Sequence, residues 1–492
     1  MRKQTKLVAV LSAAALLAIG ASMTSFAATG WVNENGTFYY YDNDGEMVTN
    51  EWKKDGNGYF YLGDEGEMVT SDWVDGEYYV GPNGAMVKNA WVKTMPEDSD
   101  DTDPDSDGEA WFYFNNKGKK VTGKEMKING RYYRFDEDGK MVDGWYEDGQ
   151  NVYYYGDEDD GARKTGWLWL ETAYDDGEVD EGIGDDYDTE AWYYFDSNGT
   201  RVQGKEKKIN GKWYSFNNYG QMNYGWVRTT DWTADAIEEG TASDAELKDL
   251  KYYFNQDNGS RVTGFIKVDG PNATGKQDDN NWYYFKDGKA KYASSSDAVA
   301  VDYKGVVGDT TKDDGSTFTK KVVKLKLEGK YFAFDDKGIM KTGKQAIKDG
   351  DDYAVYYFDE NGYMKTGKVT GVGDGDDEST YYFNTNNAGK GKGVTGAKDG
   401  YLYYKGRRQD ASDDYKIVTI DGKYYLVNTK GKIQKSASKV YTDIENEDIN
   451  NVKVNKDGQI ISVNLDLENK DDKGVAPEDV VNDAAPKAPY FD

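Results

Sequence analysis

The stretch GTFYYYDNDGEMVTNEW at residues 36–52 is followed by two near copies, NGYFYLGDEGEMVTSDW at 57–73 and GEYYVGPNGAMVKNAW at 76–91. Self-similarity at a period of about twenty residues is typical of repeat proteins, in which one supersecondary unit is stacked many times. The pattern continues from Trp31 to about Lys432, which makes about fourteen or fifteen units, the later ones less regular. The repeat unit therefore decides the fold.

Each unit joins an aromatic run, a polar turn that ends in glycine and a short apolar segment such as EMVT. Aromatic residues favour strands, and Asp or Asn followed by Gly supplies the positive φ angle of tight turns. We predict that the aromatic run and the short segment form a β-hairpin. A lone hairpin is marginally stable in water, so successive hairpins must stack. The predicted fold is all-β: an elongated β-solenoid of stacked hairpins of about 20 residues.

Composition excludes several classes of function. The chain of 492 residues has 61 Lys and Arg against 90 Asp and Glu, a net charge of −29, which repels nucleic-acid phosphates and anionic membranes. Nucleic acid is therefore excluded as a partner. The sequence has neither Cys nor His, which removes thiol nucleophiles, Ser-His-Asp triads, His-based zinc sites and disulfides.

The first residues are typical of a secretion signal. A basic head with Arg2, Lys3 and Lys6 precedes an apolar run at 7–19, and SFAA at 25–28 offers small residues for cleavage. A membrane span needs about twenty apolar residues, and this run is shorter. We predict that residues 1–28 are removed and that the mature chain is secreted without a membrane span.

Four regions are predicted from the distribution of tryptophan and of the repeats. After the signal at 1–28 come Trp-rich hairpin repeats with acidic loop inserts at 29–290 and Trp-free hairpin repeats at 291–435. Residues 436–492 are expected to form a C-terminal hairpin, with its turn at Asp457 and Gly458, and a disordered acidic tail.

The order of GW, a polar turn, WYYF, a DxxG turn, a Met and then TGW or TGK resembles the cell-wall-binding repeats of choline-binding proteins. It is also similar to the glucan-binding repeats of secreted glucosyltransferases and the carbohydrate-binding repeats of clostridial toxins. The resemblance covers about four fifths of the chain. It implies a cage between neighbouring hairpins, where aromatic rings and often a Met hold a quaternary ammonium, each ring contributing about 0.5 to 2 kcal/mol.

The resemblance places three kinds of residue in these cages: a Trp in the link between units, the leading ring of the aromatic run, and a Met after the turn. They are Trp31, Trp52, Trp73, Trp91, Trp145, Trp167 and Trp226 in the links, Phe38, Tyr59, Trp111, Tyr132, Trp192, Trp213 and Trp282 as leading rings, and Met47, Met68, Met86, Met141 and Met222 after turns. Glu77 replaces a leading ring, and no Trp follows Trp282, so we expect no choline-type site beyond about residue 290. Packing in the core is the alternative role of any single ring.

One acidic insert contains half of a calcium-loop motif. DPDSDG at 103–108 supplies Asp103, Asp105 and Asp107 as oxygen ligands, but the twelfth position, usually Glu, is Phe114. Calcium binding and a solvated acidic loop are the alternatives, and no other cofactor is expected.

The sequence predicts a non-catalytic protein, because a stack of thin hairpins lacks the deep cleft in which carboxyl groups acquire shifted pKa values. The first hypothesis is noncovalent binding to a Gram-positive cell wall through choline, or a similar substituent, of teichoic acid. The alternatives are a binder of glucan or host glycan, whose rings stack on sugars, and a structural or adhesive spacer that meets a surface partner. In each case the protein is secreted and associated with the cell wall.

Overall fold

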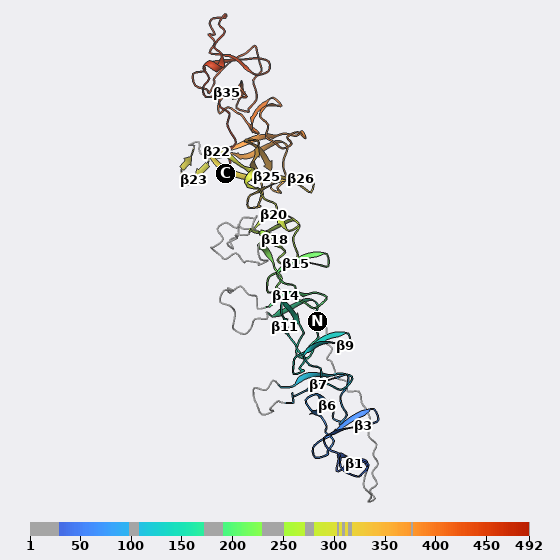
Figure 1. Cartoon of the computed structure of the whole chain (residues 1–492). Coiled ribbons are helices and arrows are strands. Elements are labelled where there is room, and N and C mark those ends of the chain that lie inside the picture. Colours follow the sequence, from blue (N-terminus) through green and yellow to red (C-terminus); the bar gives the residue numbers. More distant parts are fainter. Residues whose placement is uncertain are drawn as a thin grey trace. The chain divides into compact units, whose positions relative to one another are not determined.

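The computed structural model describes residues 29–97, 108–171, 190–228, 250–270, 280–302, 305–307, 310–312, 317–374 and 377–491. Within these residues the regular secondary structure consists almost entirely of antiparallel strands, most of them paired as two-stranded hairpins and joined by turns (Figure 1). The predicted all-β fold of hairpin repeats is confirmed. The chain divides into two compact units, the first comprising residues up to 205 with 216–222 and the second 206–215 with 223–492.

The first unit contains seven described hairpins in chain order. They are β1 (Gly30–Glu34) with β2 (Thr37–Tyr41), β3 (Glu51–Asp55) with β4 (Gly58–Leu62), β5 (Asp72–Val74) with β6 (Tyr78–Val80), β7 (Ala90–Thr94) with β8 (Ala110–Phe114), β9 (Lys124–Ile128) with β10 (Arg131–Phe135), β11 (Trp145–Asp148) with β12 (Asn151–Tyr154), and β13 (Gly166–Glu171) with β14 (Glu190–Phe195).

The hairpin of β15 (Lys205–Ile209) and β16 (Lys212–Phe216) falls at the division, and larger sheets follow in the second unit. The remaining strands are β17 (Gly225–Arg228), β18 (Leu250–Phe254), β19 (Gly264–Asp269), β20 (Asn280–Lys286), β21 (Lys289–Ala290), β22 (Ala298–Asp302), β23 (Gly305–Val307), β24 (Thr310–Lys312), β25 (Thr317–Leu327), β26 (Lys330–Asp335), β27 (Met340–Lys341), β28 (Gly343–Asp349), β29 (Asp352–Phe358), β30 (Gly367–Asp374), β31 (Asp377–Phe383), β32 (Gly396–Lys398), β33 (Tyr401–Tyr404), β34 (Arg407–Arg408), β35 (Tyr415–Ile420), β36 (Lys423–Asn428), β37 (Val440–Thr442), β38 (Asn451–Val454) and β39 (Ile460–Val463).

The two strands of each hairpin differ from the predicted pair. The aromatic run pairs with the link segment before it, so that Trp31 stands opposite Tyr40, whereas the segment after the DxxG turn adds only a single bridge, from Met47 to Tyr41. Asn35 and Gly36 explain the difference, because both have positive φ angles, 54° and 99°, and close the tight hairpin turn between the link and the run.

The DxxG turn reverses the chain after each run. In the turn at 136–139, the carboxylate of Asp136 accepts a hydrogen bond from the backbone N–H of Lys140 at 2.7 Å, and Gly139 has a φ of +87°. The segment that follows reaches back to the preceding hairpin, where the N–H of Met141 donates to the carbonyl of Trp111 at 2.8 Å. The same bond joins Met68 to Phe38 at 2.7 Å. Each turn therefore attaches one hairpin to the hairpin before it.

The core is a column of aromatic side chains inside the repeats. The run of β8 illustrates the four ring positions, which are Trp111 first, Phe112 second, Tyr113 third and Phe114 fourth. Side chains at the fourth position are fully buried, with 0% exposure at Phe114, Phe135 and Phe195. This periodic burial stabilises hairpins that would be marginal alone.

The C-terminal segment packs where the sequence predicts disorder. β38 and β39 flank the turn at Asp457 and Gly458. Beyond them Val481 and Ala484 join a core cluster with Ile417, and Phe491 is 1% exposed in another cluster. These apolar residues are isolated in a polar tail and show no periodicity, so their burial depends on a sheet surface formed by distant strands.

Some predictions lie outside the described residues: the secretion signal at 1–28, the ligands Asp103, Asp105 and Asp107, and most of each acidic insert. The described part has no group of three or more acidic side chains placed to hold a metal ion. None of its helices is both long and apolar enough to cross a membrane.

Candidate functional site

The junction between two successive hairpins is the part of the repeat where rings from different units meet. The link Trp of one hairpin contacts the third ring of its own run and the second ring of the next run. The centroid distances are 5.3 and 5.5 Å for Trp31 with Tyr40 and Phe60, 5.2 and 5.6 Å for Trp52 with Tyr61 and Tyr78, 5.6 and 4.9 Å for Trp73 with Tyr79 and Phe112, 5.2 and 4.9 Å for Trp145 with Tyr154 and Tyr193, and 5.0 and 5.4 Å for Trp226 with Tyr253 and Tyr283.

The junction of Trp91 joins rings of two successive hairpins, among them Phe135, which stacks on the indole at 5.5 Å. Its indole lies 6.4 Å from Trp111, 5.1 Å from Tyr113 and 4.9 Å from Tyr133 of the next hairpin, each at a steep angle. Met126 and Met141 pack against the same cluster. Burial raises the pKa of Tyr113 and of Tyr133 above that of a free tyrosine, as expected for rings that pack inside the repeats. Aromatic rings and methionine side chains at one junction can line a binding site for a cation whose surface is apolar.

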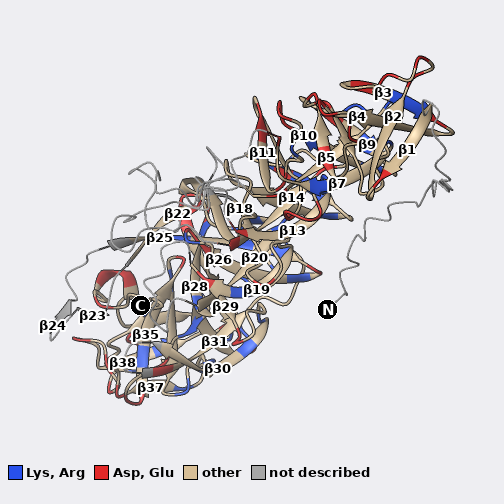
Figure 2. Ribbon diagram, turned by 90° about the horizontal axis from the view of Figure 1, so that it is seen from below, with Lys and Arg blue, Asp and Glu red and all other residues tan. Residues whose placement is uncertain are grey.

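Carboxylates lie beside this junction. The indole N–H of Trp111 donates to Asp159 at 3.2 Å, and Lys93 forms ion pairs with Asp159 and Glu158 at 3.1 and 3.2 Å. Acidic residues also fill many of the turns, whereas lysines lie on strands such as β3 and β9 (Figure 2). The local field and the net charge of −29 both favour a cationic ligand.

Several link tryptophans are held by their indole N–H groups. Trp73 donates to the carbonyl of Met95 at 2.8 Å, Trp145 to Glu171 at 3.3 Å and Trp226 to Asp269 at 3.0 Å. Each acceptor stands at the base of the next hairpin's long insert. The N–H of Trp31, by contrast, is buried with no acceptor among the described residues. These bonds give the link Trp a structural role beside any contact with a ligand.

Leading rings are more exposed than the rest of the run. Trp192 and Trp213 are 38% and 37% exposed. Trp192 contacts Trp167 at 6.4 Å and, directly across the hairpin, Trp169 at 5.6 Å. Trp169 is 48% exposed and is missing from the predicted site residues. Its position two residues after Trp167 could have identified it, because alternate residues of a strand lie on the same face.

The remaining predicted rings and methionines occupy the same places in their hairpins as Trp111 and Met141 do at the junction of Trp91. Phe38 and Tyr59 stand opposite Asn33 and Lys54, as Trp111 stands opposite Lys93. Met47 packs against the turn of the next unit, where a β-carbon at Gly66 would stand 2.7 Å from its sulfur, and Met68 has the same relation to Gly84. Glu77, which replaces a leading ring, forms an ion pair with Lys119 at 2.6 Å. The link Trp also contacts the second ring of the next aromatic run, and the sequence did not identify these second rings as site residues.

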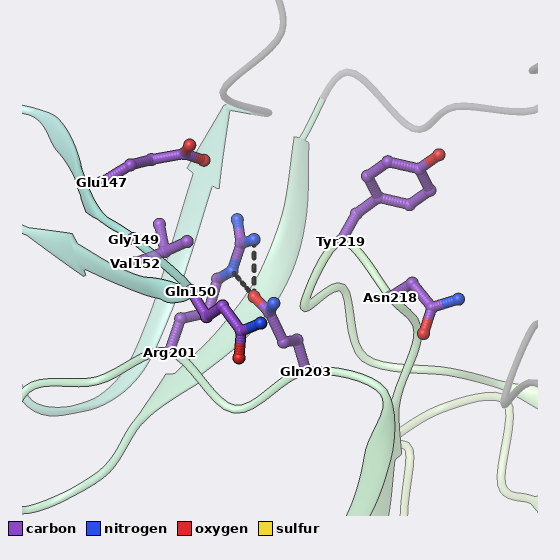
Figure 3. Close-up of a pocket in the computed structure, with 8 residues that line it drawn as sticks. All are labelled: Glu147, Gly149, Gln150, Val152, Arg201, Gln203, Asn218 and Tyr219. Carbon is purple, nitrogen blue, oxygen red and sulfur yellow. Dashed lines mark hydrogen bonds between the residues drawn. The ribbon is translucent and has the colours of Figure 1, made fainter.

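A polar hollow of about 460 Å³ lies within the first unit (Figure 3). Arg201, buried at its base, donates from Nε and Nη2 to the side-chain oxygen of Gln203 at 3.0 and 2.7 Å. The lining residues are Glu147, Gly149, Gln150, Val152, Arg201, Gln203, Asn218 and Tyr219. This mixture of amide, carboxylate and phenol groups both donates and accepts hydrogen bonds.

Models of repeat families match the chain in several places. Residues 28–73 and 67–95 match choline-binding repeats. Residues 127–141, 187–200, 276–288 and 347–364 match a putative cell wall binding repeat.

Several known proteins are similar to parts of the chain. Glucosyltransferase-S of Streptococcus mutans is 27% identical over 246 residues, covering 47% of this chain and 14% of that protein. The modular autolysin LytC from Streptococcus pneumoniae has 20% identity and a TM-score of 0.35, over 64% of this chain and 52% of that chain. Choline binding protein F from the same species has 21% identity and a TM-score of 0.25, over 77% and 99%. The chain thus spans only a small part of the length of its curated relative and about half that of the autolysin.

Proposed function

We propose that this chain, which carries repeats of the choline-binding and cell wall binding kind, is a secreted, non-catalytic protein held noncovalently on a bacterial cell wall. The ligand would be choline or a similar cationic substituent of a wall polymer such as teichoic acid. The observation that carries the proposal is the junction of Trp91, where Trp111 and Tyr133 from two successive hairpins surround one indole.

The chemistry of this junction suits a quaternary ammonium. Such a cation cannot donate hydrogen bonds, so it gains more from ring faces than from polar acceptors. Several rings contribute about 0.5 to 2 kcal/mol each, and the carboxylates of Asp159 and Glu158 add attraction from nearby. A cationic ligand would also be drawn by the net charge of −29.

The architecture of the described residues supports the non-catalytic part of the proposal. Hairpin repeats account for most described residues, and two-stranded sheets do not enclose the kind of dry cleft in which general acid catalysis tunes a carboxyl group.

The test is a titration of the mature chain with choline, followed by intrinsic Trp fluorescence and by retention on choline-bearing cell walls. We expect a saturable change of fluorescence and release of the protein from the walls by free choline. A chain that shows no response to choline and remains on walls in its presence would contradict the proposal.

The polar hollow beside Arg201 favours a second candidate, binding of a glycan. Its amide and carboxylate groups suit sugar hydroxyls, and the exposed rings of Trp169 and Trp192 offer faces on which a sugar could stack. A parallel titration with soluble glucan separates the two candidates, because only the glycan binder responds to glucan and is insensitive to choline.

A further inference from the structure

Four of the described turns carry a basic residue where other turns carry Met. The position is the second after the turn glycine, and it is occupied by Met141 after Gly139 but by Lys120, Arg163, Arg201 and Arg261 in other units. The backbone is the same in both cases: the N–H of Arg163 donates to the carbonyl of Tyr132 at 2.8 Å, just as that of Met141 donates to Trp111. Only the side chain at the junction changes.

Each of these basic side chains lies over a ring of the preceding hairpin. The guanidinium carbon of Arg163 is 4.4 Å from the ring centroid of Tyr132, and that of Arg261 is 5.1 Å from Trp213. Arg201 is 5.5 Å from Trp145, and the ammonium of Lys120 is 5.0 Å from Trp73. These are distances at which a cation interacts with a ring face.

Two of these cations also have a counter-ion that belongs to the repeat. Arg163 pairs with Glu125 at 2.7 Å, and Arg261 pairs with Glu206 at 3.0 Å. Glu125 and Glu206 occupy the same place in two near-identical links, GKEMKING at 123–130 and GKEKKING at 204–211. All four side chains are largely shielded from solvent, between 14% and 26% exposed.

The Trp-free repeats use a different residue for the same contact. Lys324 and Lys344 stand opposite the third ring position, where a link Trp stands in the first repeats. The ammonium of Lys324 lies 3.9 Å from the ring centroid of Tyr356, the second ring of the next run, and that of Lys344 lies 5.4 Å from Tyr381.

We infer that these basic residues take the place of the external cation, so that the identity of the turn and link residues decides which junctions bind a ligand. The inference rests on the proposed function. The junction of Trp91, with Met141 at its turn, is open to a quaternary ammonium. The junctions of Trp73 and Trp145 keep the link Trp but are closed by Lys120 and Arg201.

Electrostatics explains the closure. A ligand cation entering a closed junction would approach a fixed like charge at a distance of about 5 Å and would find one ring face already covered. Repulsion at that distance lowers affinity by on the order of 100-fold at a protein surface. Methionine, being apolar and flexible, imposes neither cost.

The test counts choline molecules bound per chain by equilibrium dialysis on the full mature protein. Arg201→Met and Lys120→Met each remove a closing cation beside an intact link Trp, and we expect each to add one choline site. Lys120→Met is the safer variant for folding, because Met and Lys have similar lengths and Met occupies this position in other turns. Met141→Arg is the reverse change, and it should remove one site.

Lys119→Met is the matched control. It removes one positive charge from the same turn as Lys120, where the Lys119 side chain is 51% exposed and pairs with Glu77 at 2.6 Å, and it should leave the number of sites unchanged. A wild-type protein that binds choline together with variants that neither gain nor lose a site would overturn the inference while leaving the proposed function intact. Absence of binding in the wild type and in every variant would overturn both, whereas a site present only in Arg201→Met or Lys120→Met would support the inference and reject the wild-type function.

Discussion

The sulfur of Met141 lies against Gly161 in the turn of the next unit, so closely that a β-carbon at residue 161 would stand 2.2 Å from it. Gly161 also has a φ of +53°, which residues other than glycine adopt at a cost. The glycine therefore serves two purposes, closing its own turn and admitting a side chain from the preceding unit.

Gly161→Ala should destabilise the junction of Trp91. Strain at the positive φ angle and displacement of Met141 together are expected to cost about 2 to 3 kcal/mol. Amide hydrogen exchange at Met141, whose N–H is bonded to Trp111, reports the local loss. Gly149 is the control, because its φ is +64° but nothing lies within 4 Å of its β-position. Gly149→Ala should lower the free energy of unfolding by about 1 kcal/mol. An equal loss in the two variants would show that contact with Met141 does not contribute to the effect at Gly161.

The indole N–H groups of Trp73 and Trp31 should differ in their effect on stability. Trp73→Phe removes the hydrogen bond to the carbonyl of Met95, whereas Trp31→Phe removes a buried N–H without an acceptor in the described chain. Because both changes shorten the ring equally, the difference isolates the hydrogen bond, and we expect Trp73→Phe to cost about 1 kcal/mol more. Denaturant unfolding measures both variants, and a larger loss for Trp31→Phe would be inconsistent with this assignment.

The stability of the protein should fall at alkaline pH partly because of Tyr155. Burial, followed by a hydrogen bond to Glu125, raises the pKa of this phenol above the 10.0 of a free tyrosine. The folded protein therefore retains the proton at a pH where the unfolded chain loses it, so the contribution is complete below pH 10 and is lost progressively as the pH rises further.

Tyr155→Phe should flatten this decline between pH 10 and about pH 11.5, as measured by the denaturation midpoint at each pH. At neutral pH the same variant loses its bond to Glu125, which is 2.8 Å long, and about 1 kcal/mol of stability. Tyr153→Phe, two residues earlier in the same aromatic run, serves as the control. An unchanged slope in Tyr155→Phe would show that other groups cause the alkaline loss.

Phe491 should contribute to the stability of the second unit although it is the penultimate residue. Its ring is 1% exposed and contacts Tyr353 at 5.7 Å. Phe491→Ala should cost about 3 kcal/mol by leaving a cavity in this cluster, and thermal unfolding followed by near-UV circular dichroism detects the change. Leu467→Ala, at a side chain 61% exposed, should have little effect. Equal behaviour of the two variants would indicate that the tail does not pack in solution.

Substitutions of different link tryptophans should have different effects on choline binding. Trp91→Ala is expected to abolish one saturable site, because three rings and Met141 converge there. Trp145→Ala removes a similar ring contact but at a junction already covered by Arg201, so it should reduce stability and leave choline binding unchanged. Dialysis of both variants against choline gives the comparison. Loss of a site in Trp145→Ala alone would reverse the assignment.

The architecture follows from local features that a sequence displays directly. Alternating rings such as Trp111 and Tyr113, and glycines such as Gly118 at positive φ, predict strands and turns because neither depends on distant residues. The partner of the aromatic run was predicted incorrectly because two turns flank it. The NG pair at Asn35 and Gly36 closes the hairpin, while the DxxG turn leads to a single bridge.

The site was harder to predict because its contacts join neighbouring units. Link tryptophans and leading rings were recognisable by position, but the covering of Tyr132 by Arg163 depends on residues 31 positions apart and on the turn that joins their hairpins. Burial of Phe491 has the same cause, since an isolated apolar residue acquires a partner only after distant strands have formed a surface. The local sequence pattern therefore predicts the hairpins, whereas contacts between neighbouring hairpins determine which ligand each junction can bind.

The backbone bond from Met68 to Phe38, repeated at later junctions, has a mechanical consequence. Each hairpin of the first unit is joined to its neighbour by short-range contacts, so a pulling force should detach hairpins singly instead of breaking the unit at once. Most events would release about twenty residues, or about 70 Å of extended chain, and the longer repeats of β7–β8 and β13–β14 would release more. Single-molecule stretching should show a sawtooth of separate events, and one cooperative rupture would refute it. Under the proposed function, such a chain would lengthen under load and recover when the load is removed.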